Sequence, residues 1–343
     1  MDTAVLLSAP IGFVPVIVFL AVLRYMDSYN LVSVRFVLAI IIAGGASAVA
    51  TYFLNGWLLT TFDLTFQTLT RYVAPVTEEI LKASIVVWLL YRHRIGFLVD
   101  AAIAGFAAGA GFALVENFYY LYQGLVQNPG VWIVRGFGTA MMHGGVTAIF
   151  AIIAQTLTER RMSINPLLFL PGLAAAMVLH SGFNHFFLSP VLHTALVLIF
   201  LPPIMYLVFE RSAASLHDWL HIDFDEDAQI LAQLNSGEFS DSKVGHFLHE
   251  LRDRFEGPVV VDMLCYLRLY TELALRAKGI LMMREAGIEP PENEEVNAML
   301  DELKYLEGSI GKAGLIMMNP FLHFTRKDLW QIYVLEESHR GQG

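Results

Sequence analysis

Two adjacent carboxylates and a lysine lie inside a segment that otherwise has the character of a membrane-spanning helix. The segment covers residues 74–91 and contains Glu78, Glu79 and Lys82 among apolar side chains. Each ionisable side chain at the centre of a spanning helix costs about 2.5 to 3.5 kcal/mol on insertion scales. Helical spacing lets Lys82 pair with either glutamate. One such pair leaves the other carboxylate unexplained, so the pattern predicts a functional polar site.

The composition divides the chain into an apolar part and an acidic part. The 343 residues are 56% hydrophobic, and the net charge is −10. Residues 1–209 hold 9 Lys and Arg against 8 Asp and Glu, whereas residues 210–343 hold 13 against 24. We therefore expect a membrane domain at 1–209 and an acidic helical cytoplasmic domain at 210–343.

Seven apolar stretches have the length of about 17 to 25 residues that a membrane-spanning helix needs. The third is the least hydrophobic, because it contains the charged motif. The predicted fold is all-α, a polytopic membrane helix bundle of about seven spans with a C-terminal helical domain. The stretches are residues 4–23, 34–54, 74–91, 97–122, 131–158, 166–187 and 190–209.

The loop charges predict the orientation in the membrane. Lys and Arg accumulate in short cytoplasmic loops, and here they follow the first, third, fifth and seventh stretches. Met1 to Thr3 lack the basic start of a cleaved signal peptide. We expect a multi-pass protein of the cell membrane with its N-terminus outside and its C-terminal domain in the cytoplasm. The loop residues are Arg24, Arg35, Arg92, Arg94, Arg160, Arg161 and Arg211, with Arg71 and Arg135 as exceptions.

Polar residues of four predicted spans fall at one depth. With about 1.5 Å of rise per residue, Glu78, Glu116, His143 and His180 lie roughly 9 to 14 Å below the outer surface. Asn117 follows Glu116 directly, and Asn184 lies one helical turn after His180. The spans therefore bring one polar layer together.

Structural roles are the alternative for two of these side chains. His143 could bond a backbone carbonyl, with Gly144 and Gly145 serving close helix packing. Glu116 could be an interfacial carboxylate bonded to Asn117 near an aromatic belt. The shared depth of the four residues favours a common site instead.

This set of residue types suits peptide hydrolysis. The reaction needs an activated water, a group that polarises the carbonyl and donors for the developing oxyanion. A glutamate beside another acid in a poorly solvated site suits general acid–base chemistry. Two histidines and a carboxylate could instead hold zinc with one open position. The sequence has no HExxH motif, and its single cysteine, Cys265, excludes a cysteine-built metal site.

Four motifs in this order resemble those of the PrsW family of intramembrane proteases. The resemblance covers residues 70–190, and it extends to the CAAX prenyl endopeptidases and the Abi membrane proteins. One departure concerns Asn184, because the PrsW motif usually has Asp there and the CAAX endopeptidases have Asn. The motifs are Glu78-Glu79-x-x-Lys82, Phe112-x-x-x-Glu116-Asn117, His143 and His180-x-x-x-Asn184.

The resemblance implies a role for each matched residue. Glu78 would activate water, Glu79 would assist it or pair with Lys82, and Glu116 replaces a histidine of the relatives. Asn184 would donate to the oxyanion, and Asn117 with Lys82 would support the site. If zinc is present, Glu116, His143 and His180 are its expected ligands. We expect either no cofactor or zinc, and the neutral Asn184 favours glutamate-activated water without a metal.

The resemblance also implies the substrate class. It would be a single-span membrane protein, such as an anti-sigma factor, cleaved near the outer face of the lipid bilayer. The rival from another class is a non-enzymatic membrane receptor or scaffold. A proton-coupled carrier ranks last, because the chain shows no paired broken helices or inverted repeats.

The acidic C-terminal part has helical periodicity. Its charge disfavours nucleic acid as a partner, and a regulatory or oligomerisation role is one expectation beside an ordinary solvated surface. The sequence leaves the oligomeric state open. The periodic stretches are residues 228–233, 244–255, 259–285, 294–307 and 327–335.

Overall fold

The computed structural model describes residues 3–29, 31–124, 128–161, 165–236, 243–252, 254–289 and 295–322. These residues form helices joined by short turns, which confirms the predicted all-α class within the described part of the chain. The chain divides into two compact units, Met1–Ser212 and Ala213–Gly343.

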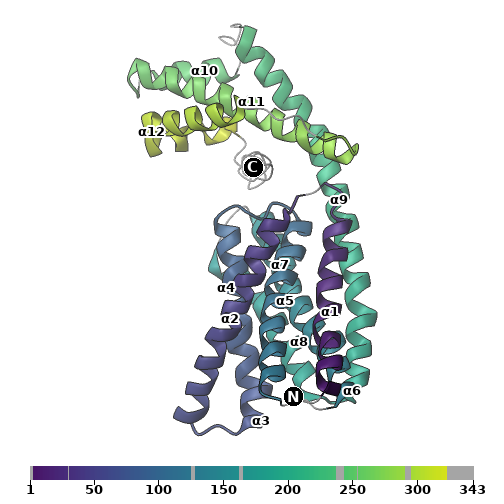
Figure 1. Ribbon diagram of the computed structural model, residues 1–343. Helices are drawn as coiled ribbons and strands as arrows, with labels where there is room; N and C mark the ends of the chain where they lie inside the picture. The colour runs from purple at the N-terminus through teal and green to yellow at the C-terminus, as the bar shows by residue number, and fades with distance from the viewer. Residues whose placement is uncertain are drawn as a thin grey trace. The chain divides into compact units, whose positions relative to one another are not determined.

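The first unit is a bundle of long helices that run side by side (Figure 1). Short helices connect them, and two π-helical segments directly precede α4 and α7. The long helices are α1 (Thr3–Met26), α2 (Val34–Thr61), α4 (Ala74–Tyr91), α5 (Leu98–Tyr122), α7 (Met141–Arg161), α8 (Leu170–His185) and the first part of α9 (Pro190–Ser236). The short elements are α3 (Phe66–Thr68), η1 (Leu69–Val73), α6 (Pro129–Ile133), η2 (Val134–Ala140) and η3 (Pro166–Phe169).

Five helical stretches of the described chain are long and apolar enough to cross a membrane. They correspond to the predicted spans at 34–54, 97–122, 131–158, 166–187 and 190–209. The described apolar part of α1, Pro10–Met26, is shorter. The 18 residues of α4 include Glu78, Glu79 and Lys82, which lower its hydropathy. Seven spans therefore stay a prediction. The five stretches are Val34–Thr61, Leu98–Tyr122, Pro129–Arg161, Pro166–His185 and Pro190–Leu220.

Helix α5 packs closely against α2 and α7 through glycines. A Cβ atom on Gly111 would lie 2.1 Å from the carbonyl oxygen of Ile41 in α2. A Cβ atom on Gly109 would lie equally close, at 2.1 Å, to the carbonyl oxygen of His143 in α7. Small residues let helix backbones approach in this way in membrane bundles. The missing side chain at Gly109 therefore sets how near His143 comes to α5.

The π-helical segment η1 is tied to α8 by side-chain hydrogen bonds. The Ser181 hydroxyl donates to the carbonyl oxygen of Arg71 at 2.6 Å. The Asn184 amide donates to the carbonyl oxygen of Thr70 at 3.0 Å. A π-helical turn disturbs the regular α-helical ladder and often accompanies a functional site. These two contacts satisfy carbonyl groups of η1 and fix where α4 begins.

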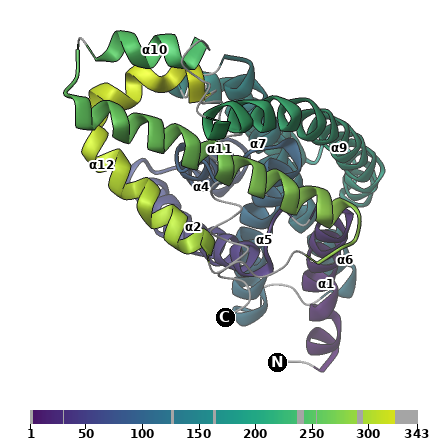
Figure 2. The ribbon, with the colours of Figure 1, turned by 90° about the horizontal axis from the view of Figure 1, so that it is seen from above.

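The second unit contains the rest of α9 with α10 (Lys243–Leu251), α11 (Gly257–Glu285) and α12 (Glu295–Leu322). Helices α11 and α12 lie side by side (Figure 2) and share an apolar core that includes Met263, Leu273 and Leu303. Helix α9 continues without a break from the apolar stretch to Ser236, so the predicted helix at 228–233 is its end. The predicted helix at 327–335 lies outside the described residues.

Candidate active site

The four predicted polar positions meet at one end of the bundle. Glu78 lies in the second turn of α4, and His143 lies in the first turn of α7. Glu116 and His180 lie near the C-terminal ends of α5 and α8. Helices α4 and α7 therefore start where α5 and α8 finish. This antiparallel arrangement places the polar side chains of four helices together.

Lys82 and His180 share one carboxylate oxygen of Glu79. The Lys82 ammonium donates to Glu79 Oε1 at 2.5 Å, and His180 Nδ1 lies 2.7 Å from the same oxygen. All three side chains are buried, with at most 2% of each exposed. Of the two pairs that helical spacing allowed, the structure forms the one between Glu79 and Lys82. Glu79 therefore supports its neighbours and is not the accessible carboxylate.

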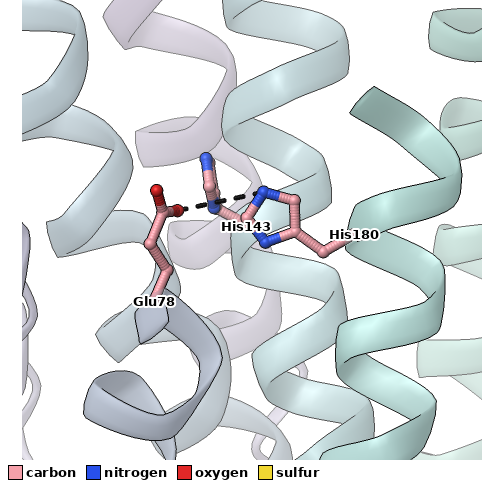
Figure 3. A group of neighbouring side chains, drawn as sticks. All are labelled: Glu78, His143 and His180. Atoms are coloured by element: carbon pink, nitrogen blue, oxygen red, sulfur yellow. Dashed lines mark ion pairs between the residues drawn. The ribbon is translucent and has the colours of Figure 1, made fainter. Parts of the chain in front are cut away.

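Glu78 faces the two histidines (Figure 3). Its Oε2 lies 3.8 Å from His180 Nε2. One nitrogen or oxygen from each of Glu78, His143 and His180 falls within 4.8 Å of the others. When His180 Nδ1–H donates to Glu79, Nε2 keeps its lone pair and points into this group. A carboxylate behind a histidine fixes the tautomer of metal-binding histidines in the same way.

His143 contacts a cation on one ring nitrogen and a carboxylate on the other. Lys82 Nζ lies 3.0 Å from His143 Nδ1, and Glu116 Oε2 lies 3.3 Å from His143 Nε2. An ammonium group can only donate. Neutral His143 then accepts through Nδ1 and carries its proton on Nε2, facing Glu116. The ring also packs against Phe112, with 5.0 Å between ring centroids.

Arg135 is the site residue that sequence reasoning missed. It lies in η2, and its guanidinium nitrogen is 3.3 Å from Glu116 Oε2. Its Nε donates to Asn117 Oδ1 at 2.8 Å, and its guanidinium carbon lies 3.7 Å from the centroid of the Tyr120 ring. An arginine inside an apolar stretch is itself a signal of function. In the charge pattern of the loops, Arg135 stands only as an exception.

The predicted supporting role of Asn117 has a defined geometry. Its amide donates to the carbonyl oxygen of Gly12 in α1 at 2.7 Å, while its oxygen accepts from Arg135. Asn117, the residue after Glu116 in α5, thus links α5 to α1 and η2.

Two predicted positions differ from the arrangement in the structure. The amide of Asn184 donates to Thr70 in η1, so its role as an oxyanion donor stays a prediction. The expected ligand set of Glu116, His143 and His180 differs from the group that the structure forms, in which Glu78 takes the place of Glu116. Glu116 is instead held by Arg135 and His143, each of which has a nitrogen 3.3 Å from Glu116 Oε2.

The donor types of this group suit a metal ion. Two imidazoles and one carboxylate that leave a position open are the ligand set of catalytic zinc sites. Glu79 behind His180 supplies the supporting carboxylate that such sites use. The group therefore fits zinc by donor type and by proximity.

Comparisons with known proteins give a family for this chain. The sequence model described as the PrsW family intramembrane metalloprotease matches residues 29–208. The comparisons with curated proteins and with solved structures gave no match. The matched range covers more than half of the chain and contains every site residue from Glu78 to Asn184. The chain therefore belongs to the PrsW family of intramembrane proteases, which makes it a membrane-embedded hydrolase.

Proposed function

We propose that the protein is an intramembrane endopeptidase that cleaves a membrane-anchored protein at the group formed by Glu78, His143 and His180. The observation that carries this proposal is the convergence of the three side chains, from three helices, to within 4.8 Å. Such a group costs free energy in an apolar bundle, and function is the usual reason for keeping it.

Hydrolysis forms a bond between the water oxygen and the peptide carbonyl carbon and breaks the C–N bond. One water proton must end on the leaving amine. Glu78, His143 and His180 would hold the metal that the family description implies, which would lower the pKa of a bound water to about 7. Glu116 lies beside this group, 3.3 Å from His143, and its carboxylate can accept the water proton and return it to the amine.

A metal-free mechanism is the second candidate, and the contact between Lys82 and His143 favours it. The lysine donates to His143 Nδ1 at 3.0 Å, which leaves the His143 proton on Nε2 instead of a lone pair for a metal. Glu78 is then the base that activates water. His143 and His180 orient the water and the carbonyl.

Metal analysis of purified, active protein separates the two mechanisms. The metal mechanism predicts about one zinc per chain, loss of cleavage with a chelator and recovery when zinc is added. Full activity without stoichiometric metal would exclude it and leave glutamate-activated water.

The proteolytic function itself is tested with Glu78→Gln. The substrate is a single-span membrane reporter, tagged at both ends, that the wild-type protein cleaves. Both mechanisms predict loss of cleavage at unchanged expression and membrane insertion. Glu210→Gln is the matched control, because Glu210 is exposed on α9 and lies away from the site. Normal cleavage by Glu78→Gln would show that cleavage does not depend on this group and would overturn the proposal.

The proposal includes a location and a substrate class. With seven spans and the N-terminus outside, the site lies in the outer half of the membrane, near the outer juxtamembrane segment of a single-span substrate such as an anti-sigma factor. Cys265 is the chain's single cysteine and is exposed. A membrane-impermeant thiol reagent should therefore label it only after the cells are lysed. Labelling on intact cells would reverse the orientation.

A further inference from the structure

A cavity of about 880 Å³ lies beside the polar group in the first unit. Its walls come from α2, η1, α4 and α5, and Glu78 and Glu116 both line it. It is open on one side and has a mostly apolar lining. The cavity and the candidate active site therefore share two carboxylates.

The side chains of the polar group differ in their exposure, and the more exposed ones line the cavity. The side chains of Glu79, Lys82, His143 and His180 are exposed by 2% or less. Those of Glu78 and Glu116 are exposed by 14% and 27%. Both of these carboxylates line the cavity. A substrate that reaches the group through this cavity meets Glu78 and Glu116 first.

The lining combines apolar surface with hydrogen-bonding groups. Aromatic rings such as Tyr52 and Phe112 alternate with Asn55 and Thr70. Asn55 also accepts a hydrogen bond from Thr77 at 2.7 Å, which ties α2 to α4. A peptide matches this mixture, because its side chains can pack on the rings while its backbone hydrogen-bonds to the polar groups. A lipid acyl chain would leave the two carboxylates facing hydrocarbon.

We propose that this cavity is the substrate-binding site and that it holds an extended, apolar segment of the substrate chain next to Glu78 and Glu116. The inference rests on the proposed proteolytic function and adds the route of entry, between α2 and the ends of α4 and α5. The continuity between the cavity wall and the polar group is the argument for a peptide occupant.

Gly56 offers a way to fill the cavity without disturbing the fold. It lines the cavity, and no atom lies within 4 Å of a Cβ atom built on it. We expect the KM for the cleaved reporter to rise in the order Gly56→Ala, Gly56→Leu, Gly56→Trp, reaching about 10-fold or more for Trp. Leu54→Trp is the matched control, because Leu54 is exposed on the same helix and lies outside the lining. A Gly56→Trp protein with the wild-type KM would overturn the proposal.

Photo-crosslinking tests binding separately from cleavage. A photo-reactive phenylalanine analogue replaces Tyr52 in the Glu78→Gln protein, and the same analogue at Leu54 is the control. We expect adducts with the tagged reporter from position 52 and not from position 54. Adducts with lipid alone would contradict the proposal. Crosslinking without wild-type cleavage would count against the proteolytic function alone, whereas cleavage without crosslinking would count against the cavity alone.

Discussion

Lys82 in the first unit and Lys278 in the second are both buried, with 0% and 1% of the residue exposed. Lys278 donates to Asp227 at 2.7 Å and lies 5.0 Å from the centroid of the Trp219 ring. Lys82 contacts Glu79, His143 and the face of Phe112. Lys278 completes a local pair, whereas Lys82 belongs to a group in which every member contacts the next.

This difference distinguishes a buried lysine that stabilises the fold from one that takes part in the chemistry of a site. A buried ion pair between two helices contributes to the arrangement of those helices, and hydrophobic residues can often replace it. A buried cation that also sets the tautomer of a histidine cannot be replaced in that way. Lys82 is therefore expected to act on catalysis, and Lys278 on the stability of its own unit.

The largest expected effect is that of Lys82→Met. Without the lysine, Glu79 and His143 lose their shared partner, and the His143 proton is no longer fixed on Nε2. Cleavage of the reporter should fall about 100-fold, as for other supporting residues of such sites. Turnover of the purified variant measures this. Activity within threefold of the wild type would place Lys82 in the same class as Lys278.

Lys278→Met should destabilise the second unit and leave cleavage unchanged. The substitution removes the ammonium group that donates to Asp227, whose side chain is 21% exposed, and we expect this loss to cost about 1 to 3 kcal/mol. Hydrogen exchange of α11 in the full-length protein measures the loss. A large drop in cleavage with normal exchange would contradict the comparison.

Arg135→Gln should reduce kcat about 10-fold with a smaller change in KM, because Arg135 positions Glu116 and does not itself line the cavity. Arg135→Lys keeps the charge but not the fork that reaches Asn117, so it should restore part of kcat. The two rate constants are measured separately with the reporter. Equal losses in both variants, with impaired insertion, would indicate a purely structural role.

The smallest effect is expected at Tyr266, whose hydroxyl donates to Glu307 at 3.0 Å. Burial, and then the charge of Glu307, raise the pKa of Tyr266 above its ordinary value. The folded protein thus keeps this proton to higher pH than the unfolded chain, whose tyrosine titrates near pH 10. Its contribution to stability is present below about pH 10 and is lost as the pH rises further.

Tyr266→Phe should therefore cost about 1 kcal/mol at neutral pH. It should also flatten the fall in stability above pH 10. Denaturation followed by circular dichroism between pH 8 and 11 compares the two proteins, and parallel profiles would contradict the expectation.

Sequence reasoning located the layer of the site because depth in a membrane follows from counting residues along helices. It placed Glu78, Glu116, His143 and His180 together, and the structure brings all four to one end of the bundle. It could not choose between the two glutamates as the partner of Lys82, because both spacings are helical. The contact between Arg135 and Glu116 also depends on helix rotation, which residue spacing alone does not give.

The π-helical segments were a further feature that the sequence did not indicate. Leu69 to Val73 and Val134 to Ala140 show no pattern that marks a π-helix, although Gly136 and Gly138 are poor helix formers. The contact of Asn184 depends on the same feature, because its amide donates to the Thr70 carbonyl in η1.

Segment η1 makes the active site sensitive to the number of residues upstream of it. Ser181 and Asn184 anchor η1 to α8. Four residues, 74–77, separate the end of η1 at Val73 from Glu78. Each residue turns an α-helix by about 100°. Removing a single residue from this short stretch would swing Glu78 and Glu79 away from His180, although hydropathy and every site residue would be unchanged. The residue register of α4 relative to η1 is thus as important to this active site as the identity of its side chains.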